Sequence, residues 1–224
     1  YHKSKNIGEM FEEYLRTLVG DDDSYKMVCV VLAFVLQYPD VLPGTMLYLR
    51  GEQGNGKSLL IWLLRTIMGE CNVGSTAKAD AITGDFNDEL AGKKVMALEE
   101  AANGVFNPKA MEVVKDLITK ATQTINTKYK SKYLVRLATL YIVCTNQDIV
   151  ARVKGDGDRR GFVINTSDKW CEQKHRKAGT LDQQCQYFMR LRMAMKHSLD
   201  QESDNEFGAF VYWLYTYPLK THPD

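Results

Sequence analysis

The eight residues at positions 51–58, with the sequence GEQGNGKS, constrain this chain more than any other part of it. They match the pattern G-x-x-x-x-G-K-[ST] in full. A short apolar run at positions 46–49 comes before them, and a helix-forming segment that ends at Gly69 comes after them. Strand, glycine-rich turn and helix in this order let backbone N–H groups turn inward around phosphate oxygens. The pattern therefore predicts a phosphate-binding loop in an α/β domain.

Two side chains of this loop suit a nucleotide that carries Mg²⁺. Lys57 can reach the β and γ phosphates, and the Ser58 hydroxyl can hold the metal ion. The alternative is a glycine-rich tight turn with a solvated lysine. We expect nucleotide binding by the loop and by the residue that follows it, namely Gly51, Glu52, Gln53, Gly54, Asn55, Gly56, Lys57, Ser58 and Leu59.

The composition of the 224 residues, 45% hydrophobic and 25% charged, is that of one ordinary α/β domain and excludes a disordered chain. The longest apolar run, at positions 27–36, is far shorter than the roughly 20 residues of a membrane helix. The chain begins with Tyr1 and has no charged and then apolar leader, which indicates a cytoplasmic, non-secreted piece of a longer protein without a membrane partner. Five cysteines without a CxxC pair favour a reducing compartment and buried, inert thiols over disulfides or zinc.

Basic and acidic residues are segregated along the chain, although the net charge is only +1. Positions 109–136 hold seven basic and two acidic residues, whereas positions 80–100 hold six acidic and two basic ones. A nearly neutral total can hide a basic surface and an acidic surface on one molecule. The net charge therefore does not exclude a nucleic-acid partner.

The hydrophobic pattern divides the sequence into three parts. Apolar residues at helical spacing before Gly20, and a second helix before Pro39, predict an N-terminal helical segment at 1–43. Positions 44–168 read as the core, with strands at 46–49, 95–98, 140–144 and 162–164, helices at 57–68 and from Pro108, and a hairpin at 122–135. Positions 169–224 are expected to form a mainly helical C-terminal segment.

Two carboxylates, Glu99 and Glu100, come directly after the strand at 95–98. In phosphate-loop ATPases an acidic residue in this place holds the Mg²⁺ shell, and a second one can polarise the attacking water. Consecutive side chains leave a strand in opposite directions, so we assign the metal to Glu99 and the water to Glu100. The alternative is a strand end with two solvated carboxylates.

Three further residues are candidates for catalysis. Asn146 follows the apolar strand at 140–144, at the sheet edge where ligands bind, and can orient water; it can equally be a turn residue. Arg159 and Arg160 lie in a loop rich in Gly and Asp. A permanently charged, planar guanidinium in a surface loop is what an arginine finger requires, and a solvated pair is the alternative.

The tip of the expected hairpin carries Lys128, Tyr129 and Lys130. Two charges beside an aromatic ring can hold a nucleic-acid strand through phosphate contacts and base stacking. A merely soluble hairpin tip is the alternative.

In order and spacing, these features resemble the superfamily-3 helicases of small DNA viruses, phages and plasmids, over positions 46–166. The motif with Asn-Gly-Lys-Ser and the Arg-Arg pair looks closest to the poxvirus-like and phage branch, in which a primase or primase-polymerase domain precedes the helicase. The resemblance implies a modified AAA+ fold with a mainly parallel central sheet. It also implies a hexameric ring held by an N-terminal collar, and 3′ to 5′ translocation on single-stranded or forked DNA.

The resemblance also implies roles for the matching residues. Lys57 and Ser58 bind ATP with Mg²⁺, Glu99 and Glu100 are the acidic pair, and Asn146 is the polar sensor. Lys128, Tyr129 and Lys130 fall on the DNA-contacting hairpin, and Arg159 falls on the finger that acts on a neighbouring subunit, with Arg160 as its competitor. A non-motor ATPase such as a helicase loader and a phosphate-loop nucleotide kinase remain the alternative functions.

Overall fold

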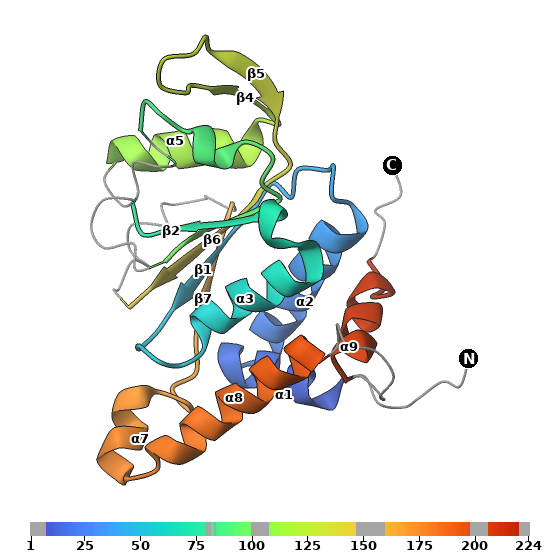
Figure 1. Ribbon diagram of the computed structural model, residues 1–224, viewed down its shortest axis with the longest axis vertical. Coiled ribbons are helices and arrows are strands. Elements are labelled where there is room, and N and C mark those ends of the chain that lie inside the picture. Colours follow the sequence, from blue (N-terminus) through green and yellow to red (C-terminus); the bar gives the residue numbers. More distant parts are fainter. Residues whose placement is uncertain are drawn as a thin grey trace. The chain divides into compact units, whose positions relative to one another are not determined.

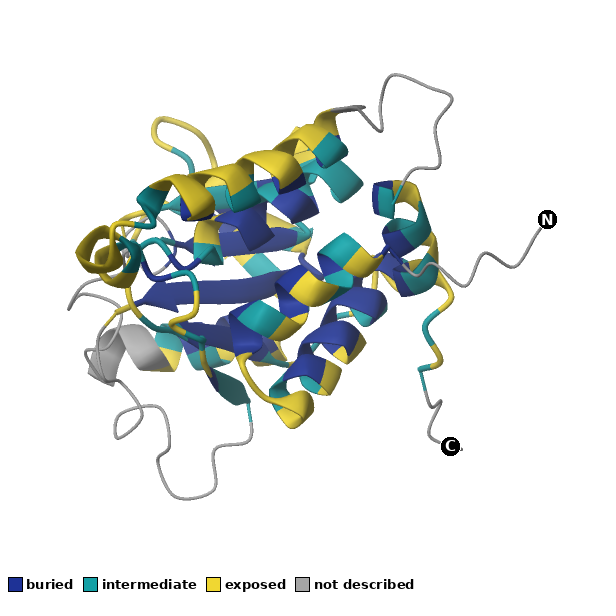
Figure 2. Cartoon of the chain, turned by 90° about the horizontal axis from the view of Figure 1, so that it is seen from below, coloured by how far each residue is buried: buried dark blue, intermediate teal, exposed yellow. Residues whose placement is uncertain are grey.

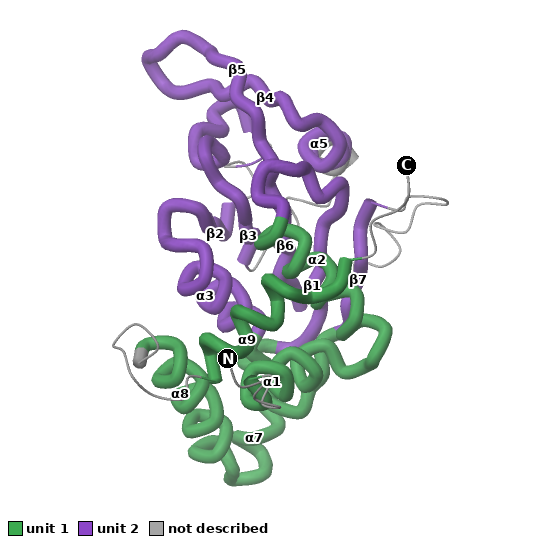
Figure 3. Tube along the Cα trace, turned by 90° about the vertical axis from the view of Figure 1, so that its right-hand side faces the viewer, with its two compact units in different colours: residues 1–37, 53–56, 166–224 green, residues 38–52, 57–165 purple. Residues whose placement is uncertain are grey.

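Residues 8–78, 82, 84–99, 108–146, 160–197 and 206–219 are described by the computed structural model. These residues form two compact units, as Figure 3 shows. The first unit consists of residues 1–37, 53–56 and 166–224, and the second of residues 38–52 and 57–165. The units follow spatial contacts rather than sequence order, and the division of the sequence into three domains stays a prediction.

The second unit is built on a five-stranded sheet in the order β2-β3-β6-β1-β7. Every pairing in this sheet is parallel. The strands are β1 (Met46–Arg50), β2 (Val73–Thr76), β3 (Val95–Leu98), β6 (Leu140–Thr145) and β7 (Gly161–Asn165). The expected α/β fold with a mainly parallel central sheet is confirmed.

Helices cover both faces of this sheet. The connection from β1 through α3 (Lys57–Met68) to β2 runs toward one edge, and the connection from β3 through α5 (Pro108–Thr119) to β6 runs the other way. Because such crossovers are right-handed, α3 and α5 lie on opposite faces, as Figure 1 shows. Strands covered on both faces need continuous apolar runs, which explains why β3 and β6 are buried along their length and β1 as far as Leu49 (Figure 2).

The face toward α5 holds one hydrophobic core of the second unit. Alternate residues of three strands point to it, and α5 and the segments beside it close it. Its members are Met46, Tyr48, Ile82, Leu90, Met96, Leu98, Val114, Leu117, Ile118, Ile125, Leu137, Tyr141 and Val143.

A separate antiparallel pair stands beside α5 (Figure 1). Strands β4 (Thr122–Ile125) and β5 (Tyr133–Arg136) pair in register, with Thr122 opposite Arg136. The hairpin expected at 122–135 is therefore confirmed. Ile125 at its base is fully buried, whereas Leu134 is 72% exposed, so only the base of the hairpin belongs to the core.

The first unit is helical. It contains α1 (Glu9–Val19), α2 (Asp22–Gln37), α7 (Glu172–Ala178), α8 (Leu181–His197) and α9 (Glu206–Tyr215). The expected apolar stripe of α1 is buried, and Gly20 ends the helix in a left-handed conformation with its N–H donated to the Arg16 carbonyl. Both findings confirm the sequence-based interpretation of this helix.

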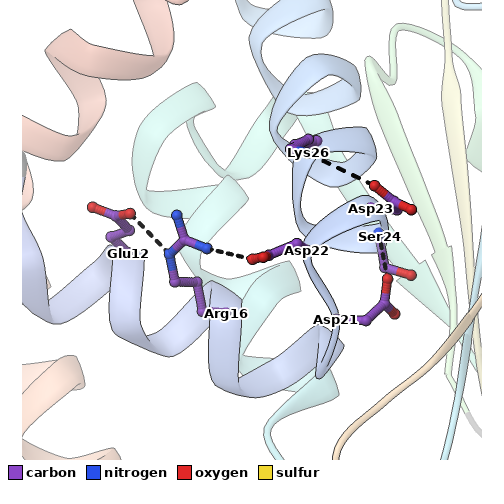
Figure 4. Close-up of polar contacts among 7 residues, drawn as sticks. All are labelled: Glu12, Arg16, Asp21, Asp22, Asp23, Ser24 and Lys26. Carbon is purple, nitrogen blue, oxygen red and sulfur yellow. Dashed lines mark hydrogen bonds and ion pairs between the residues drawn. The ribbon is translucent and has the colours of Figure 1, made fainter.

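Polar contacts fix the turn between α1 and α2 (Figure 4). The Arg16 guanidinium joins Glu12 of its own helix to Asp22 at the start of α2, with both N···O distances at 2.9 Å. The Asp21 carboxylate accepts the Ser24 N–H at 2.8 Å and so acts as the N-cap of α2. These hydrogen bonds from Ser24 lower the pKa of the Asp21 carboxyl.

The structure adds elements that the sequence pattern did not predict, and it corrects one expectation. The edge strand β2 and the single turns η1 (Glu70–Asn72) and η2 (Asp88–Leu90) were not predicted. Of the five free thiols, Cys29, Cys144 and Cys171 are buried, but Cys71 and Cys185 are exposed, so the expectation of buried thiols is wrong for these two. Within the described ranges, no helix combines the length and the apolar character that crossing a membrane requires.

Candidate phosphate-binding site

The phosphate loop leaves the sheet at the carboxyl end of β1. The Gly51 N–H donates to the carbonyl of Thr145, the last residue of β6, at 2.9 Å. Because Arg50 is paired with Thr145 in the parallel register, the next residue of each strand, Gly51 and Asn146, lies at the same level of the sheet edge. Asn146 is exposed there. Its backbone therefore lies beside the start of the loop, as expected of strands that end at one edge.

Glu99 lies at this same edge, one strand further along. Leu98 is paired with Val143 of β6, so Glu99 is level with Cys144. The Glu99 N–H donates to the Thr76 carbonyl of β2 at 2.9 Å, which fixes the backbone where the carboxylate leaves it. Since β6 separates β3 from β1, the backbones of Glu99 and the loop are about 10 Å apart, two strand spacings.

The Cys144 thiol reports the charges around it. The pKa of this thiol is raised to about 12, first by burial and then by the Glu99 carboxylate, while the Lys57 ammonium acts in the lowering direction. A carboxylate and an ammonium from two different elements therefore act on one buried atom at the edge of the sheet. The structure thus brings together Lys57, Glu99 and Asn146, which the sequence analysis placed in one site.

The Lys57 side chain folds back along the loop. Its Nζ donates to the carbonyls of Gly51 and Glu52, both at 2.7 Å. Ser58 is exposed in the first turn of α3, whereas Leu59 is buried. Of these two neighbours, only Ser58 offers an exposed side chain, and Leu59 can contribute its backbone at the positive end of the helix dipole.

The tip of the loop, residues 53–56, belongs to the helical first unit. Gly54 and Gly56 have φ values of +77° and +101°, which L-residues rarely adopt. The Asn55 side chain is buried and donates to the Thr166 hydroxyl and the Ser167 carbonyl. Asn55, expected to bind nucleotide, therefore offers its backbone rather than its side chain.

Two residues that contact the tip were missed by the sequence analysis. The Gln184 side chain donates to the Gly54 carbonyl at 2.8 Å, and the Tyr14 hydroxyl donates to the Gly56 carbonyl at 2.9 Å. Tyr14 appeared only as one member of an apolar stripe, and no sequence signal distinguishes Gln184 from its neighbours on α8.

Arg160 lies at the other end of the strands, next to the amino ends of β1 and β7. Its carbonyl accepts the Met46 N–H at 2.8 Å, and Gly161 next to it is paired with Met46 at the start of β1. The five residues of β1 span about 16 Å, so Arg160 lies at least that far from the loop of its own chain. Arg159 and Glu100 lie outside the described residues.

The hairpin tip presents the three residues expected to contact DNA. Lys128, Tyr129 and Lys130 are exposed, and Tyr129 is fully so at 102%. Tyr129 is also the one non-glycine residue in the described ranges with positive φ, at +64°. The Lys128 Nζ lies 5.4 Å from the ring centre of Phe86, itself 46% exposed. Phe86 is a further aromatic residue of this surface that the sequence analysis missed.

The base of the hairpin is tied to the segment that carries Phe86. The Asn126 N–H donates to the Asn87 side chain at 2.9 Å, and the Asn126 side chain donates to the Asp85 carbonyl at 2.6 Å. The Asn87 side chain in turn donates to the Thr124 carbonyl at 3.1 Å. Phe86 and the hairpin tip are therefore held in one surface.

This chain is similar to a protein family and to a phage protein of known name. A model described as a family of unknown function, DUF5906, matches residues 49–160, which include the loop, Glu99, the hairpin, Asn146 and both arginines. The DNA primase-polymerase of Nitratiruptor phage NrS-1 is 30% identical over 180 residues, covering 77% of this chain and 24% of that protein.

Solved structures of the NrS-1 C-terminal region share the fold. Its A form without ligand superposes with a TM-score of 0.68 at 24% identity, over 95% of this chain and 46% of that one. Another ligand-free structure of this region gives a TM-score of 0.62 at 25% identity, over 95% and 52% of the two chains. The chain spans about half of this region and about a quarter of the whole primase-polymerase. It is a homologue of that protein, and it belongs to the DUF5906 family.

Proposed function

We propose that this DUF5906 member is a phosphate-loop ATPase of the superfamily-3 helicase type, with a modified AAA+ core, that moves along single-stranded or forked DNA during phage replication. One observation carries this proposal: the phosphate loop, Glu99 and Asn146 meet at one edge of a parallel sheet. The name of the phage relative, a DNA primase-polymerase, supports a role in DNA replication. It also supports a primase-polymerase domain in the same polypeptide, which would work in the cytoplasm of the host cell.

ATP and Mg²⁺ fit the groups at this edge. The Ser58 hydroxyl and the Glu99 carboxylate are the hard oxygen ligands that Mg²⁺ prefers, and Mg²⁺ usually completes its shell with phosphates and water. Among the residues that the structure describes, no three His, Cys, Asp or Glu side chains could hold a metal ion by themselves. When bound, Mg²⁺ neutralises charge on the phosphates.

The side chains of the chain divide the work of hydrolysis. Lys57 binds the β and γ phosphates, and Asn146 orients the attacking water. Glu100 accepts a proton from this water while the water oxygen bonds to the γ-phosphorus. The bond from the γ-phosphorus to the oxygen that bridges it to the β-phosphate breaks, and ADP and phosphate are released.

The place of Arg160 supports a site that two subunits share. The Arg160 backbone at the amino end of the sheet lies about 16 Å or more from the loop of its own chain, which exceeds the length of an arginine side chain. An arginine finger from this part of the chain, Arg159 or Arg160, therefore acts on the nucleotide of a neighbouring subunit, as a hexameric ring allows.

The hairpin is the DNA-binding element of this proposal. Lys128 and Lys130 contact phosphates, and Tyr129 and Phe86 offer rings on which bases stack. Binding of this kind depends strongly on salt and weakly on sequence.

ATP hydrolysis at low salt, measured with and without single-stranded DNA over a range of protein concentrations, tests the proposal. We expect turnover per subunit to rise with protein concentration and with DNA. In Arg159→Ala hydrolysis is lost while ATP binding remains, and in the control Arg190→Ala, which removes an exposed arginine of α8, it is unchanged.

Other outcomes separate the alternatives. Turnover that is independent of protein concentration, DNA and Arg159 would indicate a self-contained nucleotide enzyme, and phosphate transfer to a nucleoside monophosphate on a thin-layer plate would identify a kinase. DNA-stimulated hydrolysis without strand separation would identify a loader. Lys128→Ala should lose the DNA response but keep basal hydrolysis, and Lys177→Ala, which removes an exposed charge elsewhere, should keep both.

A further inference from the structure

Three carbonyl oxygens at the tip of the phosphate loop accept hydrogen bonds from residues of the helical first unit. The pairs are the Glu172 N–H with Gln53 at 3.3 Å, the Gln184 Nε2 with Gly54 at 2.8 Å, and the Tyr14 hydroxyl with Gly56 at 2.9 Å. The donors come from α1, from the start of α7 and from α8. None of these donors belongs to the loop motif, so the motif alone does not determine how the tip is held.

The direction of these bonds matters because a peptide group is planar. In a trans peptide the N–H of one residue points opposite to the carbonyl before it, and the described residues contain no cis peptide. The N–H groups of Gly54, Asn55 and Lys57 therefore each point away from the donor that holds the carbonyl before them. Backbone N–H groups directed to a common side form a concave site for anions.

Gln184 is the most constrained of the donors. It is 5% exposed, and its Nε2 also donates to the Trp170 carbonyl at 2.7 Å. The Trp170 ring is itself stacked on Tyr187, with ring centres 4.2 Å apart, and on His175 at 5.1 Å. The amide of Gln184 thus joins the loop to an aromatic cluster that leaves it little freedom.

Close packing holds the same loop residues. A Cβ on Gly54 would lie 2.5 Å from the Glu172 Cβ, and a Cβ on Gly56 would lie 2.9 Å from the Phe188 Cε1. Both distances are below normal carbon contacts of about 3.5–4.0 Å. The tip of the loop therefore fits against these residues only because both positions are glycine.

We infer that Gln184 and Tyr14 are positioning residues for nucleotide binding: they hold the loop carbonyls outward and thereby aim its N–H groups at phosphate oxygens. The inference rests on the proposed function, since it assumes that the loop binds nucleotide. It makes the phosphate affinity of the loop dependent on α8, which contributes no residue to the motif. By linkage, nucleotide binding must stabilise the arrangement of the loop tip, α1 and α8 to the same extent.

Gln184→Ala tests this inference, with Gln186→Ala as the matched control. Gln186 is an exposed glutamine on the same helix, so both variants make the same chemical change. Mg-ATP is titrated into each protein by calorimetry, and KM, kcat and the thermal midpoint with and without Mg-ATP are measured. Because Gln184 donates two hydrogen bonds, we expect about tenfold weaker Mg-ATP binding in Gln184→Ala and no change in Gln186→Ala.

The division between KM and kcat distinguishes positioning from mere stability. Lost positioning affects bound substrate and transition state alike, so KM should rise with little change in kcat. The increase of the thermal midpoint with Mg-ATP should shrink by the amount that the affinity loss predicts. Tyr14→Phe keeps the buried ring and removes one hydroxyl, so it should weaken Mg-ATP binding about threefold. Because this change is small, Tyr14→Phe should stay folded and tests the inference even where Gln184→Ala fails to fold.

The outcomes identify which claim fails. If the unmodified chain binds Mg-ATP and Gln184→Ala, Tyr14→Phe and Gln186→Ala bind it equally well, the positioning role is refuted and the proposed function stands. If the unmodified chain does not bind Mg-ATP, both fail.

Discussion

The contact between Gly56 and α8 predicts the effect of the single substitution Gly56→Ala. The φ of +101° at this residue costs an L-amino acid about 1–3 kcal/mol. The new Cβ would lie 2.9 Å from Cε1 and 3.2 Å from Cζ of Phe188, and 3.3 Å from Cε2 of Tyr14. Overpacking of this kind costs about 1–3 kcal/mol. The sum, about 2–6 kcal/mol, is a large part of the roughly 5–15 kcal/mol that stabilises a typical domain.

Gly179→Ala is the matched control. Gly179 follows α7 with a φ of +68°, and no atom lies within 4 Å of an added Cβ, so this variant introduces backbone strain of roughly 1–2 kcal/mol without a clash. The free energy of unfolding in urea and the affinity for Mg-ATP are measured for both. We expect Gly56→Ala to lose more stability than Gly179→Ala, and to lose Mg-ATP binding that the control keeps. Equal stability losses would refute the close contact between the loop and α8.

Three further predictions follow from exposure and charge. Ellman's reagent should modify two thiols of the native chain, Cys71 and Cys185, and all five in urea; modification of a third native thiol at the same rate would contradict the burial of the others. The free energy of unfolding should fall above pH 9, because the unfolded Cys144 thiol loses its proton there while the native thiol, with a pKa of about 12, keeps it. In Cys144→Ala the slope of the unfolding free energy against pH should be shallower by about 1.4 kcal/mol per pH unit. Asp21→Ala should lower the thermal midpoint and Asp21→Asn should not, because either Asp or Asn can accept the Ser24 N–H; the advantage of the unmodified chain over Asp21→Ala should shrink only as the pH falls through the lowered pKa of the Asp21 carboxyl.

The sheet could be predicted where the sequence carries a simple signal. β3 and β6 are covered on both faces, and each is an apolar run bounded by charged or turn-forming residues. β2 has the sequence VGST and only Val73 is buried, so it shows neither an apolar run nor an alternation. It is a strand because it pairs with β3, and a pairing partner is tertiary information.

The candidate site divides in the same way. Lys57, Glu99 and Asn146 each follow or begin an element that the pattern predicts, so their meeting at one edge follows from parallel strands. Gln184 lies 130 positions from Gly54, and Tyr14 lies 42 positions from Gly56. No periodicity relates residues so far apart. Arg160 was predicted as a residue type, but only the register of β7 places it away from the loop.

The positions of these residues imply that the effect of subunit contact on kcat and the effect of Gln184 and Tyr14 on KM can be separated in one set of kinetic measurements. In the proposed function, an arginine finger from the amino end of the sheet of another subunit stabilises the transition state, so it would act on kcat and only where subunits meet. The bonds from Gln184 and Tyr14 lie within one chain, and by our inference they set the affinity of the loop for phosphate. Dilution should therefore lower kcat in the unmodified chain and in Gln184→Ala alike, whereas the ratio of their KM values should stay constant at every protein concentration. If that ratio changed with concentration, α8 would act through assembly rather than through the phosphate loop.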